Sequence, residues 1–384
     1  MVAITNGRLI TPFQEIEQGA VLIEGRRIVA LGPTQKLILP EGMRIIDVGG
    51  NIVAPGFLDL HIHGTSGHDV MEASIEGLRA MAEILASQGT TGFLPTTMTA
   101  PSCEILAALQ TIREAAEKSS EGAEILGAHL EGPYLNPEHA GAQPLAYIRP
   151  PSLEEFDGFL AAYEGVRLLT LAPEQPGALE LVSHAHKRGV TISIGHSGAG
   201  YETVLEGVRR GLTYAAHTFC GMKALHHRDP GPVGAVLSLD EIRAEVIADN
   251  IHVHPAVVKI LARAKGVAGV VLVTDSSPLA GLPDGSYHLH NQEMKVQKGL
   301  IRTAAGRLAG SALSMDRAVK NVLADAELTL PQAIQMATYN PACSIGVETS
   351  KGSLAPGKDA DLVVLDEDLK VRLTMIKGRV VYRA

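Results

Sequence analysis

The chain has 384 residues, of which 46% are hydrophobic, so it can form one large barrel or two ordinary domains with a sizeable core. A formal net charge of −9 and the lack of a long basic run argue against nucleic acid as the main partner. No apolar run is long enough to cross a bilayer, and the first residues lack the features of a signal peptide. Three widely spaced cysteines do not suggest a disulfide framework, so we expect a cytoplasmic protein without a membrane partner.

The N-terminal part of the chain is predicted to form short β-strands joined by tight turns. Residues that favour strands cluster around an Asn-Gly turn in residues 4–11 and a Glu-Gly turn in residues 20–32. The C-terminal stretch, residues 352–383, has three short apolar runs separated by polar turns. Because neither piece is large enough to fold alone, we expect residues 1–54 and 343–384 to combine into one small β-sandwich.

Between these ends, apolar runs recur at the spacing of βα units, and helical patterns lie between most of them. Two of the helical stretches, residues 74–89 and 176–189, end with glycine, which is common at helix C-termini. Residues 221–243 are expected to form a loop followed by a helix. Residues 55–342 are therefore predicted to form a (β/α)8 TIM-type barrel of the α/β class. The predicted strands are residues 55–62, 91–97, 124–130, 166–172, 190–196, 213–219, 244–249 and 269–275.

An open, doubly wound sheet is the structural alternative to the barrel. A dinucleotide-binding version of that fold would carry a Gly-rich phosphate loop after its first strand, and this chain has none there. The barrel is therefore the favoured interpretation.

Side chains that can bind metal ions stand at the ends of five predicted strands, where barrel enzymes carry their catalytic residues. His61 and His63 are two residues apart on the first strand, so both side chains can face the barrel axis. Glu131 could bind one ion or bridge two, and Asp275 could bind an ion or act as a general base. The complete set is His61, His63, Glu131, His196, His217 and Asp275.

Taken singly, each of these side chains could cap a loop or helix or form a salt bridge. Four imidazoles and two carboxylates in one barrel mouth, however, would be costly to remove from water without a metal ion. Imidazole and carboxylate suit zinc, iron, manganese and cobalt. The pattern therefore predicts a divalent metal site and a metal-assisted hydrolase.

Other histidines and one basic stretch have more than one interpretation. His129 shares a strand face with Glu131, and we expect it to lie behind the metal site. His252 and His254 form a second His-x-His pair; it could be a rival metal pair, but we favour His252 as a substrate contact and His254 as structural. The basic stretch 223–228 is either a solvated loop or an anion pocket, and its position beside the barrel mouth favours the pocket.

Several motifs occur in a specific order over nearly the whole chain. They are PGFLDLHIHG, HLEGPYLN, TLAPE, GHSGAGYE, HHRDPGPVG, ADNIHVHP, LVTDSSPLAGLPDG, LAGSALSMDRAVKN, TYNPA and GSLAPGKDADLVVLD. With them the chain resembles the amidohydrolase superfamily, and within it the N-acetylglucosamine-6-phosphate deacetylases. The resemblance implies a (β/α)8 barrel with a β-sandwich. It also implies release of acetate from N-acetyl-D-glucosamine 6-phosphate to give D-glucosamine 6-phosphate, in amino-sugar catabolism.

The resemblance also implies roles for individual residues. Glu131, His196 and His217 would bind the main ion, and His61 and His63 would bind a second one, so one or two divalent ions are expected per subunit, with zinc favoured. The strand-four motif TLAPE offers no lysine as a bridging ligand, so Glu131 would take the bridging position. Asp275 would be the catalytic acid and base. The chain would form a homodimer in which Arg228 reaches the neighbouring active site. The sugar-phosphate site would be lined by Gln143, Cys220, Gly221, Arg228, His252, Leu308, Ala309 and Gly310.

Two positions depart from the family pattern. Cys220 stands where the family usually has asparagine, and Gln143 stands where many members carry histidine. Gln143 can donate a hydrogen bond but cannot carry a positive charge, and Cys220 is expected to be a small wall residue rather than a ligand or nucleophile. The departures leave open N-acetylgalactosamine 6-phosphate, or another N-acylated amine, as the substrate. An inactive binding scaffold is a further alternative, which the intact set of ligand-type residues disfavours.

Overall fold

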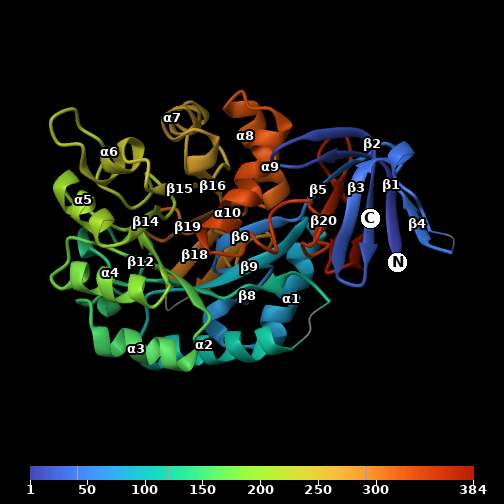
Figure 1. The fold of residues 1–384 in the computed structure, drawn as a ribbon. Coiled ribbons are helices and arrows are strands. Elements are labelled where there is room, and N and C mark those ends of the chain that lie inside the picture. Colours follow the sequence, from blue (N-terminus) through green and yellow to red (C-terminus); the bar gives the residue numbers. More distant parts are fainter. Residues whose placement is uncertain (41, 119–120, 290–291) are drawn as a thin grey trace.

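A computed structural model describes residues 1–40, 42–118, 121–289 and 292–384. Within these residues, eight parallel strands lie side by side in chain order, which confirms the predicted α/β barrel (Figure 1). Backbone hydrogen bonds bring the end of the last strand back to the first, since Asp275 N donates to His61 O over 2.8 Å and His63 N donates to Ser276 O over 3.0 Å. The strands are β6 (Phe57–Ile62), β9 (Thr90–Thr97), β11 (Ala128–Glu131), β12 (Val166–Leu171), β13 (Thr191–Ile194), β14 (Leu212–Ala215), β15 (Arg243–Val246) and β16 (Val270–Leu272).

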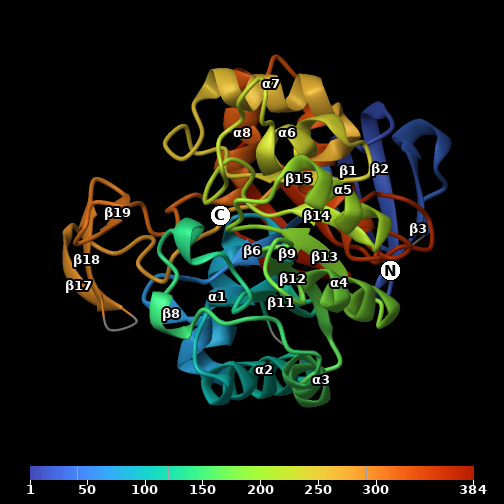
Figure 2. The same cartoon turned by 90° about the vertical axis from the view of Figure 1, so that its left-hand side faces the viewer.

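Helices surround these strands, as the end-on view in Figure 2 shows. The predicted helix at 74–89 begins where the Ser74 side chain accepts a hydrogen bond from Gly77 N. None of the helices in the described ranges is long and apolar enough to cross a membrane. The helices are α1 (Ile75–Ser87), α2 (Ser102–Glu117), α3 (Leu153–Ala162), α4 (Ala178–Lys187), α5 (Tyr201–Arg209), α6 (Gly231–Ser238), α7 (Pro255–Lys265), α8 (Met315–Asp325), α9 (Leu330–Ala337) and α10 (Tyr339–Ser344).

The two ends of the chain meet in a separate sheet at one end of the molecule, where Figure 1 shows both termini. Antiparallel pairing of β5 with β20, with Val53 opposite Val364, joins the N-terminal strands to the C-terminal ones. Both groups of strands contribute side chains to one apolar core. We propose residues 1–54 and 343–384 as this domain and residues 55–342 as the barrel. The strands are β1 (Val2–Ile10), β2 (Glu15–Glu24), β3 (Arg27–Pro33), β4 (Arg44–Asp47), β5 (Ile52–Pro55), β20 (Leu362–Leu365), β21 (Val371–Ile376) and β22 (Arg379–Arg383).

A small antiparallel sheet that the sequence reasoning missed lies between β16 and α8. It consists of β17 (Gly285–Leu289), β18 (Gln292–Gln297) and β19 (Leu300–Thr303), and it projects beside the barrel in Figure 2. Its inner side chains Met294, Val296 and Ile301 are buried in a cluster of their own. Strands β7 (Gly64–Thr65) and β8 (His68–Asp69) form a short antiparallel hairpin. Strand β10 (Glu124–Ile125) pairs in parallel with β9.

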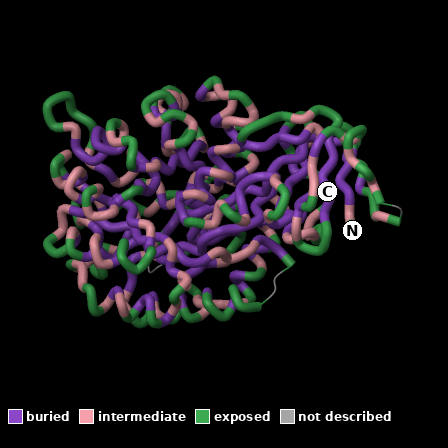
Figure 3. The backbone as a smooth tube through the Cα atoms, in the orientation of Figure 1, coloured by how far each residue is buried: buried purple, intermediate pink, exposed green. Residues whose placement is uncertain are grey.

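A cluster of buried charges joins the barrel to the terminal sheet. Figure 3 shows buried backbone running through the barrel strands and on into that sheet. The Lys351 ammonium lies 2.6 Å from a Glu124 carboxylate oxygen on the barrel side and 2.6 Å from Asp361 and 3.1 Å from Asp359 on the sheet side. Burial opposes its charge, but the carboxylates outweigh burial and raise the pKa of Lys351 above its ordinary value. Lys351 thus neutralises the two buried aspartates of the GKDADL motif at the domain junction.

Replacing Lys351 with methionine should destabilise the protein by about 3–5 kcal/mol, because it leaves the buried carboxylates of Asp359 and Asp361 without this cation. The free energy of unfolding from urea titration measures the effect. Lys370→Met is the matched control: its side chain is 69% exposed and its nitrogen is 3.9 Å from Asp368. The control should change stability by less than ~0.5 kcal/mol. Equal effects of the two substitutions would show that the buried cluster does not stabilise the junction.

Candidate metal centre and active site

The six metal-binding side chains predicted from the sequence meet at the C-terminal ends of the barrel strands. Glu131 is the last residue of β11, and His196, His217 and Asp275 lie just beyond β13, β14 and β16. The last three have positive φ angles of 48°, 27° and 46°, in the left-handed region that residues other than glycine rarely adopt. Such backbone strain is typical of functional sites. Here it accompanies the turn of each chain segment at the mouth of the barrel.

The carboxylate of Glu131 is the centre of this cluster and is buried. Its Oε1 atom lies 2.9 Å from His217 Nε2 and 3.1 Å from His196 Nε2. His61 Nε2 lies 3.4 Å from the same Oε1 atom, and His63 Nε2 lies 3.1 Å from Oε2. One carboxylate therefore contacts all four imidazoles, which is the position that a bridging ligand would have.

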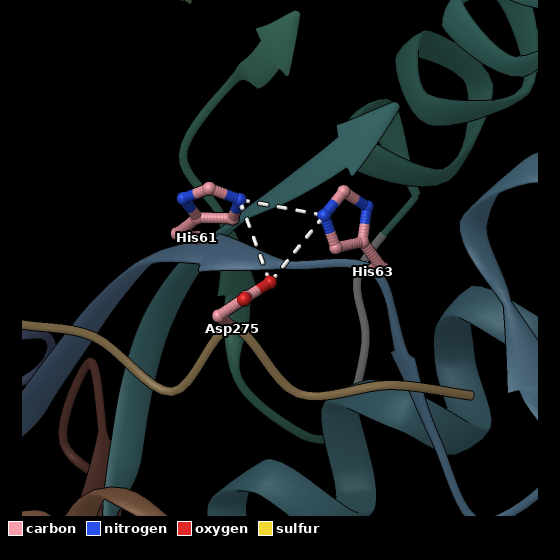
Figure 4. Close-up of side chains that lie close together, drawn as sticks. All are labelled: His61, His63 and Asp275. Atoms are coloured by element: carbon pink, nitrogen blue, oxygen red, sulfur yellow. Dashed lines mark hydrogen bonds and ion pairs between the residues drawn. The ribbon is translucent and has the colours of Figure 1, made fainter. Parts of the chain in front are cut away.

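His61, His63 and Asp275 form a second group of donor atoms at the same centre. Figure 4 shows the three side chains pointing toward one another. Asp275 Oδ1 lies 3.6 Å from His61 Nε2 and 3.5 Å from His63 Nε2, and the two Nε2 atoms are 3.3 Å apart. Donor atoms of this group lie within 4.8 Å of one another, as do those of His61, Glu131 and His217. The two groups share His61.

Each of the four imidazoles has an oxygen acceptor within hydrogen-bond distance of its Nδ1 atom, the ring nitrogen that does not contact Glu131. A carbonyl or carboxylate oxygen accepts but does not donate, so Nδ1 carries the hydrogen and the Nε2 lone pair faces Glu131. This arrangement is typical of histidines that bind metal ions. The pairs are His61 with Glu245 Oε2 at 3.0 Å, His63 with Thr96 O at 3.1 Å, His196 with His139 O at 2.9 Å, and His217 with Cys220 O at 3.1 Å.

The donor atoms fit a divalent metal ion. His196 and His217 bring their Nε2 atoms to 3.2 Å, and two lone pairs at that distance repel unless a proton or cation lies between them. Burial opposes protonation of His61, but the charges of Glu131, Glu245 and Asp275 raise its pKa well above the ordinary value. Burial likewise opposes the charged form of Glu131, but the surrounding histidines hold its pKa well below the usual range. The centre therefore attracts positive charge, and its nitrogen and oxygen donors suit zinc and related ions.

A cavity of about 270 Å³ opens above the cluster and contains most of the predicted substrate-binding residues. Its apolar walls include Met98, Leu289 and Met294, the last two from the sheet that the sequence reasoning missed. Arg228 does not line this cavity; it is exposed on the neighbouring loop, with a guanidinium nitrogen 2.7 Å from His227 Nε2. The predicted residues in the lining are Gln143, Cys220, Gly221, His252, Leu308, Ala309 and Gly310.

The two positions that depart from the family pattern have defined contacts. Gln143 Oε1 accepts a hydrogen bond from Thr99 N over 2.9 Å, so the amide nitrogen must face the other way, where it donates to Glu131. Burial and the nearby carboxylate of Asp275 raise the pKa of the Cys220 thiol to about 12, so the thiol is protonated at neutral pH. Cys220 is a wall residue of the cavity, and its backbone carbonyl supports His217.

The two residues of the second His-x-His pair, His252 and His254, lie in different surroundings. His252 lines the cavity and lies 2.7 Å from Asp249 Oδ2 through its Nδ1 atom. Burial opposes its charge, but the hydrogen bond and charge of Asp249 raise the pKa of His252 above its ordinary value. His254 caps α7 by accepting a hydrogen bond from Ala256 N. The two imidazoles therefore have separate partners, Asp249 for His252 and the start of α7 for His254.

Two residues that support the site, Glu245 and Asp249, were not predicted from the sequence. Glu245 and Asp249 hold His61 and His252, as described above. A signal for Glu245 was present, because an acidic residue within the apolar strand segment AEVIAD needs a buried partner. His129 lies behind the site as expected, with its ring centroid 4.6 Å from that of His61 and its Nε2 atom 2.8 Å from Thr170 Oγ1.

Comparisons with solved structures reproduce the fold over the full length of the chain. N-acetylglucosamine-6-phosphate deacetylase from Pasteurella multocida superimposes with a TM-score of 0.94 at 30% identity, covering 100% of both chains. The enzyme of the same name from Thermotoga maritima gives a TM-score of 0.90 at 35% identity, again covering 100% of both chains.

Sequence comparisons agree with the structural ones. Residues 52–381 match the Amidohydrolase family. The N-acetylglucosamine-6-phosphate deacetylase of Lysinibacillus sphaericus is 40% identical over 88% of each chain. The N-acetylgalactosamine-6-phosphate deacetylase of Escherichia coli O157:H7 is 38% identical over 89% of this chain and 91% of that protein. The chain therefore belongs to the amidohydrolase family.

Proposed function

We propose that the protein is a metal-dependent deacetylase that hydrolyses N-acetyl-D-glucosamine 6-phosphate to D-glucosamine 6-phosphate and acetate, in amino-sugar catabolism. The observation that carries the proposal is the contact of four imidazoles with Glu131, which lines the cavity together with three of them. A homologous enzyme from Mycobacterium smegmatis, with a TM-score of 0.92 at 29% identity over 99% of both chains, has been solved as a mutant in complex with this sugar phosphate. The three unpaired cysteines suit a reducing cytoplasm.

The metal would be held by the cluster around Glu131. In this proposal Glu131, His196 and His217 hold the main ion, and His61 and His63 hold a second one, with Glu131 between them. Zinc is the favoured ion, and iron, manganese and cobalt suit the same donors. A bound ion supplies Lewis-acid polarisation of the acetyl carbonyl and makes water more acidic.

Asp275 is the proposed acid and base. Its carboxylate lines the cavity beside the Nε2 atoms of His61 and His63, so it can reach a water molecule that attacks the acetyl carbon from the side of the metal centre. The water oxygen forms a bond to the carbonyl carbon while Asp275 accepts the water proton. As the C–N bond breaks, Asp275 returns that proton to the amine nitrogen, so acetate and the free amino sugar leave the site.

The sugar phosphate would be bound at the other end of the cavity. His252, whose pKa is raised by the hydrogen bond and charge of Asp249, can offer a charge-assisted hydrogen bond to the phosphate. Gly221 and residues 308–310 offer backbone groups close to the sugar. We propose that the chain forms a homodimer and that Arg228, exposed on its loop, completes the phosphate site of the neighbouring subunit.

N-acetylgalactosamine 6-phosphate is the second candidate substrate. A relative that carries this name is nearly as similar to the chain as those named for the gluco sugar. Cys220 also removes an amide that could contact the sugar, which gives a physical reason for a different preference at this position. An inactive binding scaffold is disfavoured because all six side chains that can bind metal ions converge at the mouth of the barrel.

Asp275→Asn should lower kcat for acetate release by roughly 10²- to 10⁴-fold, because asparagine has the shape of aspartate but cannot accept the water proton. Steady-state kinetics with metal analysis of the same samples measure this effect. Asp240→Asn, a change of an exposed carboxylate outside the cavity, is the control and should leave kcat unchanged. A metal-loaded Asp275→Asn enzyme with near wild-type kcat would rule out Asp275 as the base.

Arg228→Ala should raise KM for the phosphorylated sugar by about 10- to 100-fold, the loss expected for one charge-assisted contact to phosphate. Activity on the unphosphorylated sugar should not change. Arg263→Ala, which removes a guanidinium that is 70% exposed on α7, is the control. An unaltered KM for the phosphorylated sugar would exclude Arg228 from the phosphate site.

Mixed dimers test whether Arg228 acts across the interface. In a dimer of one Arg228→Ala and one Asp275→Asn subunit, the first subunit keeps Asp275 and receives Arg228 from its partner. Mixing the two variants should therefore restore activity at low KM. Without restoration in verified mixed dimers, Arg228 would not act in the neighbouring site.

A further inference from the structure

Glu245 is a buried acid that none of the proposed catalytic steps uses. It is the third residue of β15, it is fully buried, and it lies beneath the metal centre inside the barrel. A carboxylate in such a place is costly unless its charge is compensated. The contacts of the Glu245 carboxylate therefore indicate which groups compensate its charge.

A single oxygen of Glu245 contacts both halves of the metal centre. Its Oε2 atom accepts from His61 Nδ1 over 3.0 Å and from the backbone N of His217 over 2.9 Å. His61 belongs to the proposed second ion position and His217 to the proposed main one. The acid thus supports one ligand of each position at once.

Among the four imidazoles of the centre, His61 is the one backed by a carboxylate. The other three are backed by backbone carbonyl oxygens, which carry no net charge. A carboxylate behind an imidazole increases its basicity and strengthens its bond to a metal ion. The second ion position is therefore influenced by the negative charge of Glu245 through His61. The imidazoles of the main position have only neutral carbonyl oxygens at Nδ1.

The acids around His61 also favour positive charge at the centre. Its Nδ1 atom lies 3.0 Å from a Glu245 oxygen. Its Nε2 atom lies 3.4 Å from a Glu131 oxygen and 3.6 Å from an Asp275 oxygen. In the part of the chain that the structure describes, the ion pairs of these acids are with histidines and not with lysine or arginine. When the imidazoles bind metal ions as neutral ligands, three buried carboxylates are better balanced by two divalent ions than by one.

We infer that Glu245 is a positioning residue that links the two ion positions, holding His61 as a strong ligand of the second ion and fixing His217 at the main one. The inference rests on the proposed function, because it assumes that the cluster around Glu131 binds metal. It goes beyond that function by assigning a role in binding the second ion to a residue outside the ligand set.

Equilibrium dialysis with zinc and metal analysis of the full-length protein tests this inference. Wild-type protein should bind two ions per subunit. Glu245→Gln keeps the acceptor oxygen but removes the charge, so it should retain the main ion and weaken the second by about 10- to 100-fold. Cobalt absorption spectra of the same variants, which report ligand geometry, should change only for the second equivalent.

Two further variants separate positioning from general stability. Glu245→Asp keeps the charge and should recover part of the second-ion affinity; this variant also serves if the glutamine variant does not fold. Glu155→Gln removes a part-buried acid from a cluster with Arg149 and Tyr134, away from the cavity lining. It should lower stability while leaving both ion affinities unchanged.

The outcomes distinguish this inference from the proposed function. If Glu245→Gln binds two ions as tightly as wild type, the inference is wrong. If wild type binds a single ion and the substitution does not alter it, the inference is also wrong, although a single-ion deacetylase still stands. If wild type binds no ion at all, the proposed function itself fails.

Discussion

The negative charge buried at the mouth of the barrel is the constraint on which the rest of the site depends. Glu131 has almost no contact with water, and its carboxylate is approached by the Nε2 atoms of four imidazoles. Those atoms can face it only because each Nδ1 hydrogen is held from behind by an oxygen. Three residues of the site also adopt left-handed backbone angles. Such an arrangement is costly for an empty barrel and favourable for one that binds a metal ion.

Much of this could be predicted from the sequence, because strand periodicity places side chains without knowledge of tertiary contacts. Two residues of the same strand, such as His61 and His63, must share a face. The C-terminal ends of barrel strands must meet, which brings Glu131 and Asp275 together although they are far apart in the chain. The terminal strands were predictable as well, since neither end could bury its apolar residues alone.

The parts that could not be predicted depend on contacts between segments distant in sequence. Nothing local links Glu245 to His61, since the two meet only when the first and seventh strands are held in the same barrel. The sheet of β17 to β19 lies between two of the sequence motifs, in a stretch with no predicted element, although it contributes one wall of the cavity. Arg228 is exposed in a single chain, and its proposed role needs a second copy that no pattern within one chain describes.

Acetate release by the metal-loaded wild-type protein tests the central claim most directly. Three substrates should be compared: N-acetylglucosamine 6-phosphate, N-acetylgalactosamine 6-phosphate and unphosphorylated N-acetylglucosamine. We expect kcat/KM to be highest for the first, by at least about tenfold over the unphosphorylated sugar, which corresponds to about 1.4 kcal/mol of phosphate recognition. Faster release from the galacto sugar would contradict the gluco assignment. No release from any of them, with metal shown to be bound, would contradict the proposed reaction.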